Sequence, residues 1–354
     1  MQSRSRGEIV LAMTNKGNKV ATQMKAWVVR QLGPPDSMVL EDVEEGAPPP
    51  DRVRIKIEAA AVNFPDALLV AGLYQVKPEL PFVVGLEVSG RVLAAPSGSL
   101  LKPGDRVLAL LQTGGGLTSG GFGELVDASP ATVIPIPEAM SFEHASALML
   151  TYQTGYFGLH RRAQIKEGEV LLVHAGAGGV GSAAIQLGKA AGARVVATAG
   201  SDAKVRLCQE LGADLAVNYK EGDFVQAVKD FTGGAGADVI YDPVGGDVYD
   251  KSTKCIAFEG RLVVVGFTSG RIPTAAVNHA LVKNYSIVGL HWGLYNQRAP
   301  QLVAAATEEL FRLYLAGKIR PHISDRRPLA EAPLALATVA EGRSTGKVVI
   351  LPGA

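Results

Sequence analysis

This sequence is poor in cysteine and shows almost no excess charge of either sign. Cys208 and Cys255 are its two cysteines, so a disulfide framework is excluded and a reducing compartment, the cytoplasm, is indicated. A net charge of +1 argues against nucleic acid as the main partner. No apolar run approaches the roughly 18 residues that a membrane-spanning helix needs. We therefore expect a cytoplasmic protein with no membrane partner.

Residues 1–23 differ from the rest of the chain, because they are basic and lack the apolar stretch of a secretory signal. Their charged residues are Arg4, Arg6, Glu8, Lys16 and Lys19. An organellar transit segment has this character. A disordered leader, or a start assigned upstream of a true beginning at Met24, has it too. We expect a disordered extension over 1–23 and exclude it from the fold.

Apolar residues are abundant: they make up 47% of the 354 residues, whereas charged residues make up 19%. This length predicts two domains. After Met24 the chain is β-rich, with strands expected over 25–30, 38–43, 52–61, 83–94, 106–111 and 124–127. Between the last two strands, 114–123 is expected to be a flexible glycine-rich loop, and helices are expected over 141–150 and 154–162.

From Glu169 onward strands and helices alternate, which is typical of a parallel sheet. The expected strands are 170–174, 194–198, 215–218, 239–242, 261–266 and 286–290. The expected helices are 182–191, 202–211, 224–232 and 247–256. A helix over 300–315 and a closing strand over 347–351 follow. Because this alternating part begins only at Glu169, about 150 residues after Met24, we expect the β-rich part before it to carry part of the substrate site.

The most informative segment joins the first strand of that second part to a helix. It reads Gly176-Ala177-Gly178-Gly179-Val180-Gly181. Glycines here let the backbone turn tightly and approach a pyrophosphate, whose charge is stabilised at the helix N-terminus. A turn that serves only packing is the alternative, but the flanking strand and helix favour dinucleotide binding.

The residues after the second strand indicate which dinucleotide binds. An NAD site has an Asp or Glu about 20 residues beyond the glycines. This chain has Gly200 and Ser201 there, and Asp202 is interpreted as an N-cap or first-turn residue. Lys204 and Tyr219 could accept a 2′-phosphate, although Lys204 could also be an ordinary surface lysine. The sequence therefore favours NADPH.

Several motifs over Met24 to the C-terminus resemble one family. They are 245–248 (Gly-Gly-Asp-Val), 264–267 (Val-Val-Gly-Phe), 283–284 (Lys-Asn), 289–293 (Gly-Leu-His-Trp-Gly) and 344–347 (Ser-Thr-Gly-Lys). The chain is similar to the zinc-free quinone oxidoreductases among the medium-chain dehydrogenases/reductases. The resemblance implies an α/β fold in which a Rossmann nucleotide-binding domain (150–290) is inserted in a GroES-like β-barrel catalytic domain (24–149, completed by 291–354).

Zinc alcohol dehydrogenases of the same superfamily supply metal ligands at three positions where this chain has none. Asn63 stands in place of the first cysteine, Leu86 in place of the histidine and Leu150 in place of the third ligand. A four-cysteine zinc lobe is also absent from the sequence. Because tetrahedral zinc needs three or four converging ligands, we expect no metal. Without a Lewis acid, the reaction must suit an electrophilic acceptor, a quinone or an α,β-unsaturated carbonyl.

The resemblance assigns Asn63, Asp66 and Tyr74 to the substrate cleft as candidate catalytic residues. Tyr74 matches the proposed proton donor of related enoyl-thioester reductases, and a phenol in hydrogen-bond reach can fill that role. Each has a structural alternative: Asn63 could cap a turn and Tyr74 could be a cleft wall. Asp66 and Glu87 are interpreted as more structural, holding loop amides or an arginine.

The resemblance also places residues around the cofactor. Besides the glycine turn they are Thr151, Val244, Gly266, Phe267, Leu290, Trp292 and Lys347, with Trp292 open to interpretation as simple packing. The six histidines show no metal spacing and are expected to be structural. The segment 284–290 resembles the edge strand through which the family's dimers extend their sheet, so a homodimer is expected.

We therefore expect an NADPH-dependent oxidoreductase that reduces a quinone or an enone. An enoyl-thioester reductase acting on acyl-CoA is the enzymatic alternative, although no Arg/Lys cluster for the nucleotide tail is obvious. An NADPH-binding structural protein with little turnover, as crystallin relatives are, is the alternative from another class.

Overall fold

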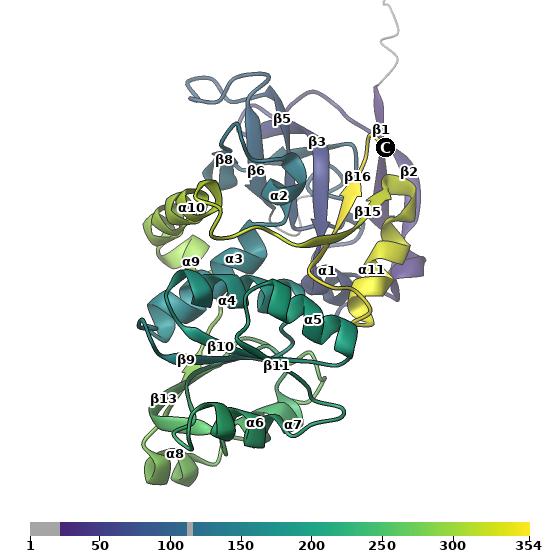
Figure 1. The fold of residues 1–354 in the computed structure, drawn as a ribbon. Coiled ribbons are helices and arrows are strands. Elements are labelled where there is room, and N and C mark those ends of the chain that lie inside the picture. The colour runs from purple at the N-terminus through teal and green to yellow at the C-terminus, as the bar shows by residue number, and fades with distance from the viewer. Residues whose placement is uncertain (1–21, 112–115) are drawn as a thin grey trace, which may run out of the picture.

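The computed structural model describes residues 22–111 and 116–354, and Figure 1 shows two sheet-based halves that meet at a layer of helices. The first half holds a three-stranded sheet, in the order β2 (Val39–Glu44), β1 (Gln23–Val29), β4 (Phe82–Val83). Beside it lies a seven-stranded sheet. Six of its strands follow the order β15 (Ile323–Pro328), β16 (Lys347–Leu351), β3 (Val53–Val62), β5 (Glu87–Ala94), β6 (Arg106–Leu110), β8 (Val133–Pro135), and β7 (Leu125–Ala128) pairs with β3.

The C-terminal strand β16 completes this barrel. It pairs antiparallel with β3, where Val349 lies opposite Ala61 and Val348 opposite Val62. Residues more than 280 positions apart are thereby joined, and Lys347 is brought to the point where β3 ends. The end of β3 leads directly into helix α1 (Phe64–Val70). This junction is where the candidate site forms.

The second half is a six-stranded parallel sheet, and all its neighbouring strands run in the same direction. Its order is β11 (Leu215–Asn218), β10 (Arg194–Ala199), β9 (Val170–Val173), β12 (Ala237–Asp242), β13 (Ile256–Val264), β14 (Ser286–Gly289). Its helices are α4 (Gly179–Ala190), α5 (Asp202–Glu210), α6 (Phe224–Phe231), α7 (Gly246–Ser252) and α8 (Val277–Lys283). The strand order reverses between β9 and β12, which is where ligands bind in such sheets.

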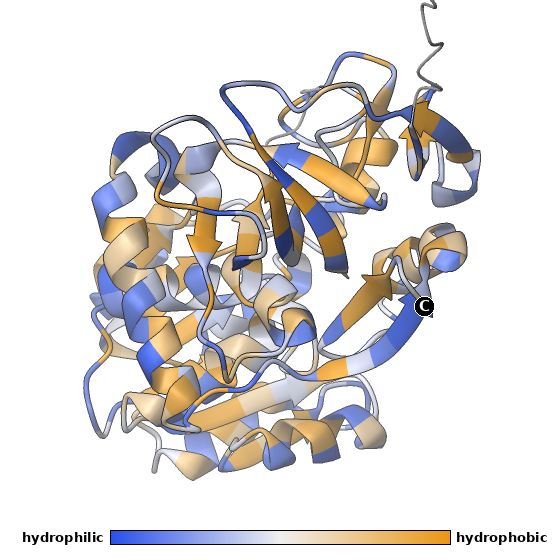
Figure 2. Cartoon of the chain, turned by 90° about the horizontal axis from the view of Figure 1, so that it is seen from above, coloured by the Kyte–Doolittle hydropathy of each residue, from blue (hydrophilic) through white to orange (hydrophobic). Residues whose placement is uncertain are grey.

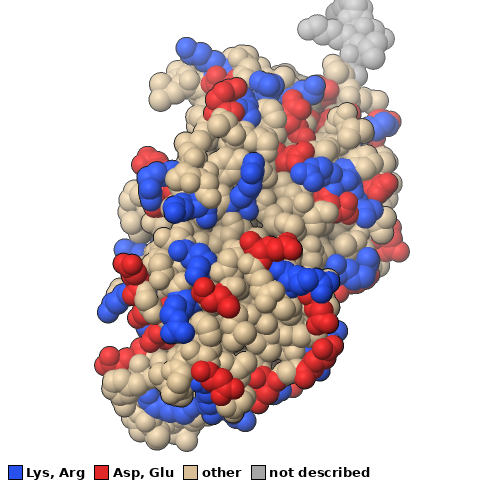
Figure 3. Space-filling model, viewed as in Figure 1, with Lys and Arg blue, Asp and Glu red and all other residues tan. Residues whose placement is uncertain are grey.

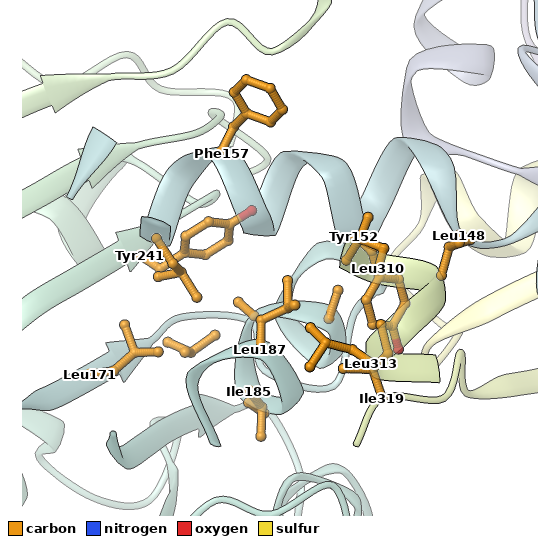
Figure 4. Packing of buried hydrophobic residues seen from close by; sticks show 14 of the residues in the cluster. Leu148, Tyr152, Phe157, Leu171, Ile185, Leu187, Tyr241, Leu310, Leu313 and Ile319 are labelled. Atoms are coloured by element: carbon orange, nitrogen blue, oxygen red, sulfur yellow. The ribbon is translucent and has the colours of Figure 1, made fainter. Parts of the chain in front are cut away.

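Helices between the halves carry the main core. They include α2 (Phe142–Ser146), α3 (Met149–Tyr156) with a π-helical continuation over Phe157–Arg162, α9 (Gly293–Arg298), and α10 (Pro300–Leu315). Figure 4 shows Tyr152 of α3 beside Leu310 and Leu313 of α10, with Leu187 of α4 lying toward the strand that carries Leu171. Helix α11 (Ala332–Ala340) packs instead against the barrel core.

The local patterns explain these elements. All four residues of β9 are buried, as expected of a strand covered on both faces, whereas exposed and buried residues alternate at the start of β1. In Figure 2 the strands are largely hydrophobic and the outer helices carry both colours. Helix α4 approaches β9 closely because it has glycine at 188: a Cβ there would lie 2.5 Å from Leu171 Cδ2.

The predicted fold class, a Rossmann nucleotide-binding fold inserted in a GroES-like barrel, is confirmed, and several local predictions need correction. The strand expected over 83–94 is two strands, β4 and β5, because the chain turns at Gly85, whose φ is +111°. The helix expected over 154–162 starts at Met149 and is π-helical in its second half. Strands β8 and β15 and helices α8, α9 and α11 were not expected, because they are short or lack a clear period.

Two expectations concern the edges of the described chain. The predicted extension 1–23 lies outside the described residues except for Thr22 and Gln23, and Gln23 already begins β1. The loop expected to be flexible over 114–123 is closely packed in its second part. A Cβ at Gly120 would lie 2.0 Å from the Val83 carbonyl oxygen, so glycine is needed there for close approach rather than for mobility. Among the described residues, no helix is long and apolar enough to cross a membrane.

Candidate active site

The glycine turn lies at the switch point of the parallel sheet, after β9 and at the start of α4. No side chain caps the α4 N-terminus, whose N-cap is Gly178. The third glycine of the motif is sterically required, because a Cβ at Gly181 would lie 2.2 Å from the Ala175 carbonyl oxygen. Gly178, Gly179 and Val180 are partly exposed. The turn therefore offers uncapped backbone amides at an accessible helix end, which suits a pyrophosphate.

Both halves of the molecule contact this turn. A Cβ at Gly179 would lie 3.2 Å from Thr151 Cγ2 of α3 and 3.4 Å from Lys347 Cδ of β16. The Gly346 amide donates a hydrogen bond to the Ala177 carbonyl at 2.7 Å. The structure thus brings the predicted residues Thr151, Gly179 and Lys347 together, although they lie on three separate segments.

The residues predicted to select the cofactor also gather at one place, beyond β10 and β11. The Tyr219 ring covers Gly200, since a Cβ at Gly200 would be 2.9 Å from the Tyr219 hydroxyl. Ser201 is the N-cap of α5 and its hydroxyl accepts a hydrogen bond from the Lys204 amide, so Asp202 is a first-turn residue, as interpreted.

Among the described residues, Lys204 has no carboxylate partner. Its ammonium group donates to the Gly342 carbonyl at 2.7 Å. Burial lowers the pKa of Lys204, and the positive charge of Lys220 lowers it further. Two nearby cations and no acid in contact with Lys204 make this end of the sheet a favourable place for an anion such as a 2′-phosphate.

The next strand ends carry the remaining predicted cofactor residues. Asp242 ends β12, and its Oδ1 accepts hydrogen bonds from the Val244 and Gly245 amides at 2.8 and 3.0 Å. Phe267 lies over this turn, as a Cβ at Gly245 would be 2.8 Å from its ring, and a Cβ at Gly266 would be 3.3 Å from the Pro243 carbonyl oxygen. Val244, Gly266 and Phe267 therefore form one group at the carboxyl edge of the sheet.

Leu290 and Trp292 are placed differently from one another. The Leu290 side chain approaches Gly158 of the π-helical segment, and its amide bonds to Val264. Trp292 is buried in the main core, with its indole nitrogen lacking a partner. For Trp292 the structure favours the packing interpretation.

A buried polar cluster lies where β3 ends, and it contains Asn63, Asp66, Glu87 and Lys347. None of the four is more than 4% exposed. Lys347 Nζ donates to Asn63 Oδ1 and lies 3.8 Å from Glu87 Oε2. Asn63 Nδ2 donates to Glu87 Oε2 at 3.4 Å, and the Asn63 amide donates to Asp66 Oδ2 at 2.7 Å. The ammonium group of Lys347, on β16, thus lies among residues of α1 and its N-cap and of β5.

Glu87 also joins this cluster to the cofactor side. Its Oε1 accepts a hydrogen bond from the Leu150 amide at 3.0 Å, in the first turn of α3. A carboxylate at a helix N-terminus is stabilised by the helix dipole and by unpaired amides. Thr151, the following residue, contacts the glycine turn. Glu87 and Asp66 hold backbone amides as interpreted, but their cationic partner is a lysine rather than an arginine.

Burial dominates the electrostatics of the cluster. It raises the pKa of Asp66 to about 7, against the opposing effects of the Asn63 amide and the Lys347 charge. Burial also raises the pKa of Glu87 and lowers the pKa of Lys347, while the carboxylates act in the opposite direction on the lysine. Such perturbed groups in one place are typical of functional sites.

Tyr74 lies close to this cluster in a segment that follows α1. Its amide bonds to the Leu68 carbonyl at 3.2 Å, and its side chain is only partly exposed. Burial and then the charge of Asp66 raise the pKa of Tyr74, so the phenol stays protonated at neutral pH. Asn63 and Asp66 are therefore in hydrogen-bond contact, and the charge of Asp66 acts on the phenol of Tyr74.

Metal-ligand clusters are absent from the described residues: no three His, Cys, Asp or Glu side chains there converge. Four of the six histidines contact a hydroxyl or a ring, and His174 is the most buried.

Sequence reasoning did not assign Glu87, Lys220 or Asp242 to the site. The sequence shows that Glu87 follows Gly85 and Leu86, but its hydrogen bond with the Leu150 amide of α3 depends on the tertiary fold.

Comparison with known proteins agrees with this geometry. Residues 49–138 match the family model described as alcohol dehydrogenase GroES-like domain, and residues 179–308 match the one described as zinc-binding dehydrogenase. A "Quinone oxidoreductase-like protein 2 homolog" from Nematostella vectensis is 39% identical over 303 residues, covering 84% of this chain and 81% of the relative. The chain belongs to the quinone oxidoreductase family of the medium-chain dehydrogenases/reductases.

Solved structures of similar proteins have the same fold. A probable oxidoreductase from Mycobacterium abscessus is 37% identical with a TM-score of 0.84, over 94% of this chain and all of that one. An Escherichia coli quinone oxidoreductase complexed with NADPH is 29% identical with a TM-score of 0.83, over 93% of this chain and 99% of that one. The family resemblance found in the motifs is thereby confirmed.

Proposed function

We propose that this member of the quinone oxidoreductase family transfers hydride from NADPH to a quinone or an α,β-unsaturated carbonyl, without zinc. The observation that carries the proposal is the meeting of the uncapped glycine turn with the Asn63–Asp66–Glu87–Lys347 cluster at Gly179. The similar Escherichia coli structure holds NADPH, which supports the choice of cofactor. When bound, NADPH supplies the hydride.

The protein's own residues would hold and orient the two reactants. The turn 176–181 would bind the pyrophosphate through backbone amides, and Lys204 with Tyr219 would bind the 2′-phosphate. Val244, Gly266, Phe267 and Leu290 would position the remaining cofactor groups at the strand ends. Holding two reactants in line is itself a large catalytic contribution in reactions of this type.

Proton delivery falls to groups of the barrel, because no metal-ligand cluster is found among the described residues to stabilise an oxyanion. Tyr74 is the candidate donor, since the family resemblance assigns it to the substrate cleft and its phenol carries a proton at neutral pH. An acceptor that is already electrophilic needs only this proton and the hydride. Quinones and conjugated carbonyls meet that requirement, whereas a simple ketone would need a Lewis acid.

A homodimer formed through β14 also belongs to this proposal. β14 is an edge strand of the six-stranded sheet, and Ile287 on it is 37% exposed. The adjacent helix α8 exposes Val277, Leu281 and Val282. Unpaired strand edges beside exposed apolar side chains are suited to extending a sheet across two subunits.

The deciding experiment measures NADPH oxidation by the purified protein with quinones, enals, enones and enoyl-CoA esters, in parallel for Tyr74→Phe. We expect turnover of quinones and enones, and a loss of enone rate of at least roughly 100-fold in the variant, the lower end of general-acid contributions. Tyr156→Phe is the matched control, because that half-buried tyrosine packs on His160 instead. NADPH binding without turnover of any acceptor would favour a structural role, and a preference for enoyl-CoA esters would favour a thioester reductase.

A further inference from the structure

The buried cluster contains more acid than base. Asp66 and Glu87 are completely buried and Lys347 is 4% exposed, so two carboxyl groups share one ammonium group out of contact with water. Among the described residues, no other charged side chain hydrogen-bonds to the three. A buried uncompensated negative charge is very unfavourable. The cluster therefore keeps one proton on its carboxyl groups at neutral pH.

Hydrogen bonding indicates where this proton lies. Both carboxylate oxygens of Glu87 accept hydrogen bonds. Oε1 accepts from the Leu150 amide, and Oε2 accepts from Asn63 Nδ2 and lies near the Lys347 ammonium group. At Asp66, Oδ2 accepts from the Asn63 amide, whereas the buried Oδ1 forms no well-aligned hydrogen bond with any described residue, and the Leu86 amide has only a small lowering effect on the pKa of this carboxyl. An oxygen that lacks a well-aligned donor is the natural place for a carboxylic acid O–H. Asp66 is thus the protonated member and Glu87 is the carboxylate paired with Lys347.

The groups that face Asp66 come from every element packed around it. They are Lys347 on β16, Glu87 on β5, the Leu86 amide just before β5, the Asn63 amide at the end of β3, and Tyr74 beyond α1. Tyr74 is the group among them that is partly exposed, so it is the one that solvent or a bound acceptor can reach. The raised pKa of Asp66, about 7, agrees with an acid that can both hold and release a proton near neutrality.

We propose that Asp66 stores the proton that a reduced enone takes up at carbon, and that Glu87 holds Lys347 so that Asp66 stays protonated. This inference rests on the proposed function. For an enone, hydride forms the new Cβ–H bond and leaves an enolate. The Tyr74 O–H bond then breaks as the Cα–H bond forms, and the Asp66 O–H proton restores the phenol. Solvent reprotonates Asp66 before the next turnover, so one hydride and one proton are consumed.

The kinetic test compares Asp66→Asn with the wild-type enzyme on two acceptors. Asparagine has nearly the same shape but cannot relay a proton. We expect the enone rate to fall roughly 100-fold, since carbon protonation needs a positioned acid, and the quinone rate to fall by a clearly smaller factor, since a hydroquinone oxygen takes its proton from water. An unchanged enone rate, or an equal loss on both acceptors, would overturn the relay.

Glu87→Gln is the second variant, and it leaves Lys347 with Asp66 as its only carboxyl partner. Asp66 should then ionise, so the enone rate should fall as in Asp66→Asn and the basic limb of its pH profile should move below that of the wild type. A role of Glu87 in folding alone would lower both acceptor rates and leave the pH profile in place, which would contradict the proposal. Thermal unfolding of both variants checks that they fold.

A cofactor-free measurement tests proton storage directly. Infrared spectra of the wild type should show the C=O stretch of a buried protonated carboxyl at about pH 6, lost by about pH 8, on either side of the pKa of about 7. The band should be missing in Asp66→Asn, and a band that persists there would overturn the assignment. A protein that shows the band but turns over no acceptor would overturn the proposed function and with it the relay. Turnover with an unchanged enone rate in Asp66→Asn would overturn the relay alone.

Discussion

At the scale of single residues, the site depends on groups that lack partners. Within the described part of the chain, Lys204 donates to a carbonyl but contacts no acid, Asp66 Oδ1 has no well-aligned donor, and no side chain caps the glycine turn. At each of these groups a ligand or a proton would supply the missing hydrogen bond or opposite charge. Elsewhere charges are paired and mixed: on the face in Figure 3, residues of both signs are interspersed.

Lys204→Gln should change the choice of cofactor. Charge-assisted hydrogen bonds contribute about 1.5–3 kcal/mol, so we expect the KM for NADPH to rise by at least roughly 10-fold. The KM for NADH should change less than about 2-fold, since NADH has no 2′-phosphate. Steady-state kinetics with both cofactors measure this, and Lys56→Gln on the exposed face of β3 is the control. An equal change for both cofactors would contradict a 2′-phosphate contact.

At the scale of elements, His174 joins strands and a helix below the glycine turn. The residue follows β9, and its ring nitrogens bond to Thr198 of β10 at 2.9 Å and Ser252 of α7 at 2.8 Å. The Ser252 hydroxyl donates to Val248, so it must accept from His174 Nε2–H, which leaves Nδ1 to accept from Thr198. The ring is thereby held neutral, and burial lowers its pKa to about 3.

Acid should destabilise the protein through this histidine. The unfolded chain binds a proton at His174 below its pKa of about 6.5, whereas the folded protein binds it only near pH 3. The free energy of unfolding therefore decreases as the pH is lowered from about 6.5 to about 3. The contribution approaches about 1.4 kcal/mol per pH unit within that window. Urea unfolding between about pH 7 and pH 4 should show a shallower pH dependence in His174→Gln. Parallel curves for the two proteins would disprove the low pKa, since all other histidines are common to both.

At the scale of the whole molecule, the barrel and the parallel sheet both reach the candidate site through one residue. Lys347 on the last strand contacts the glycine turn through its Cδ and the barrel cluster through its Nζ. Opposite ends of the chain therefore meet in the site. The far edge of the parallel sheet, β14, remains open with exposed apolar residues beside it.

Placing a charge on that edge should separate the proposed dimer. A lysine on an edge strand opposes pairing with another strand, so Ile287→Lys should sediment as a monomer while the wild type sediments as a dimer. Leu100→Lys is the matched control, because Leu100 is an exposed apolar residue of the barrel half, and it should stay dimeric. A monomeric wild type, or a dimeric Ile287→Lys, would refute the interface.

Local sequence patterns alone predicted much of the nucleotide-binding half. Buried apolar runs, a glycine turn and helical periods are short-range signals, and the strands they predict agree with β9 to β14 to within a few residues, apart from the earlier start of β13. The missing carboxylate after β10 was equally visible. Short elements such as β8 and α9 were not predictable, because too few residues define a period.

By itself, the sequence determined the fold class, the family resemblance, the glycine turn and the absence of ligands at the zinc positions. Only the tertiary structure decided that Glu87 bonds to the first turn of α3, that Lys347 bonds to Asn63 beside Glu87, and that Asp66 Oδ1 has no well-aligned donor among the described residues. The physical reason is distance along the chain. Asn63 and Lys347 are 284 residues apart, and burying a charge beside its partner is a property of packing that no local pattern contains.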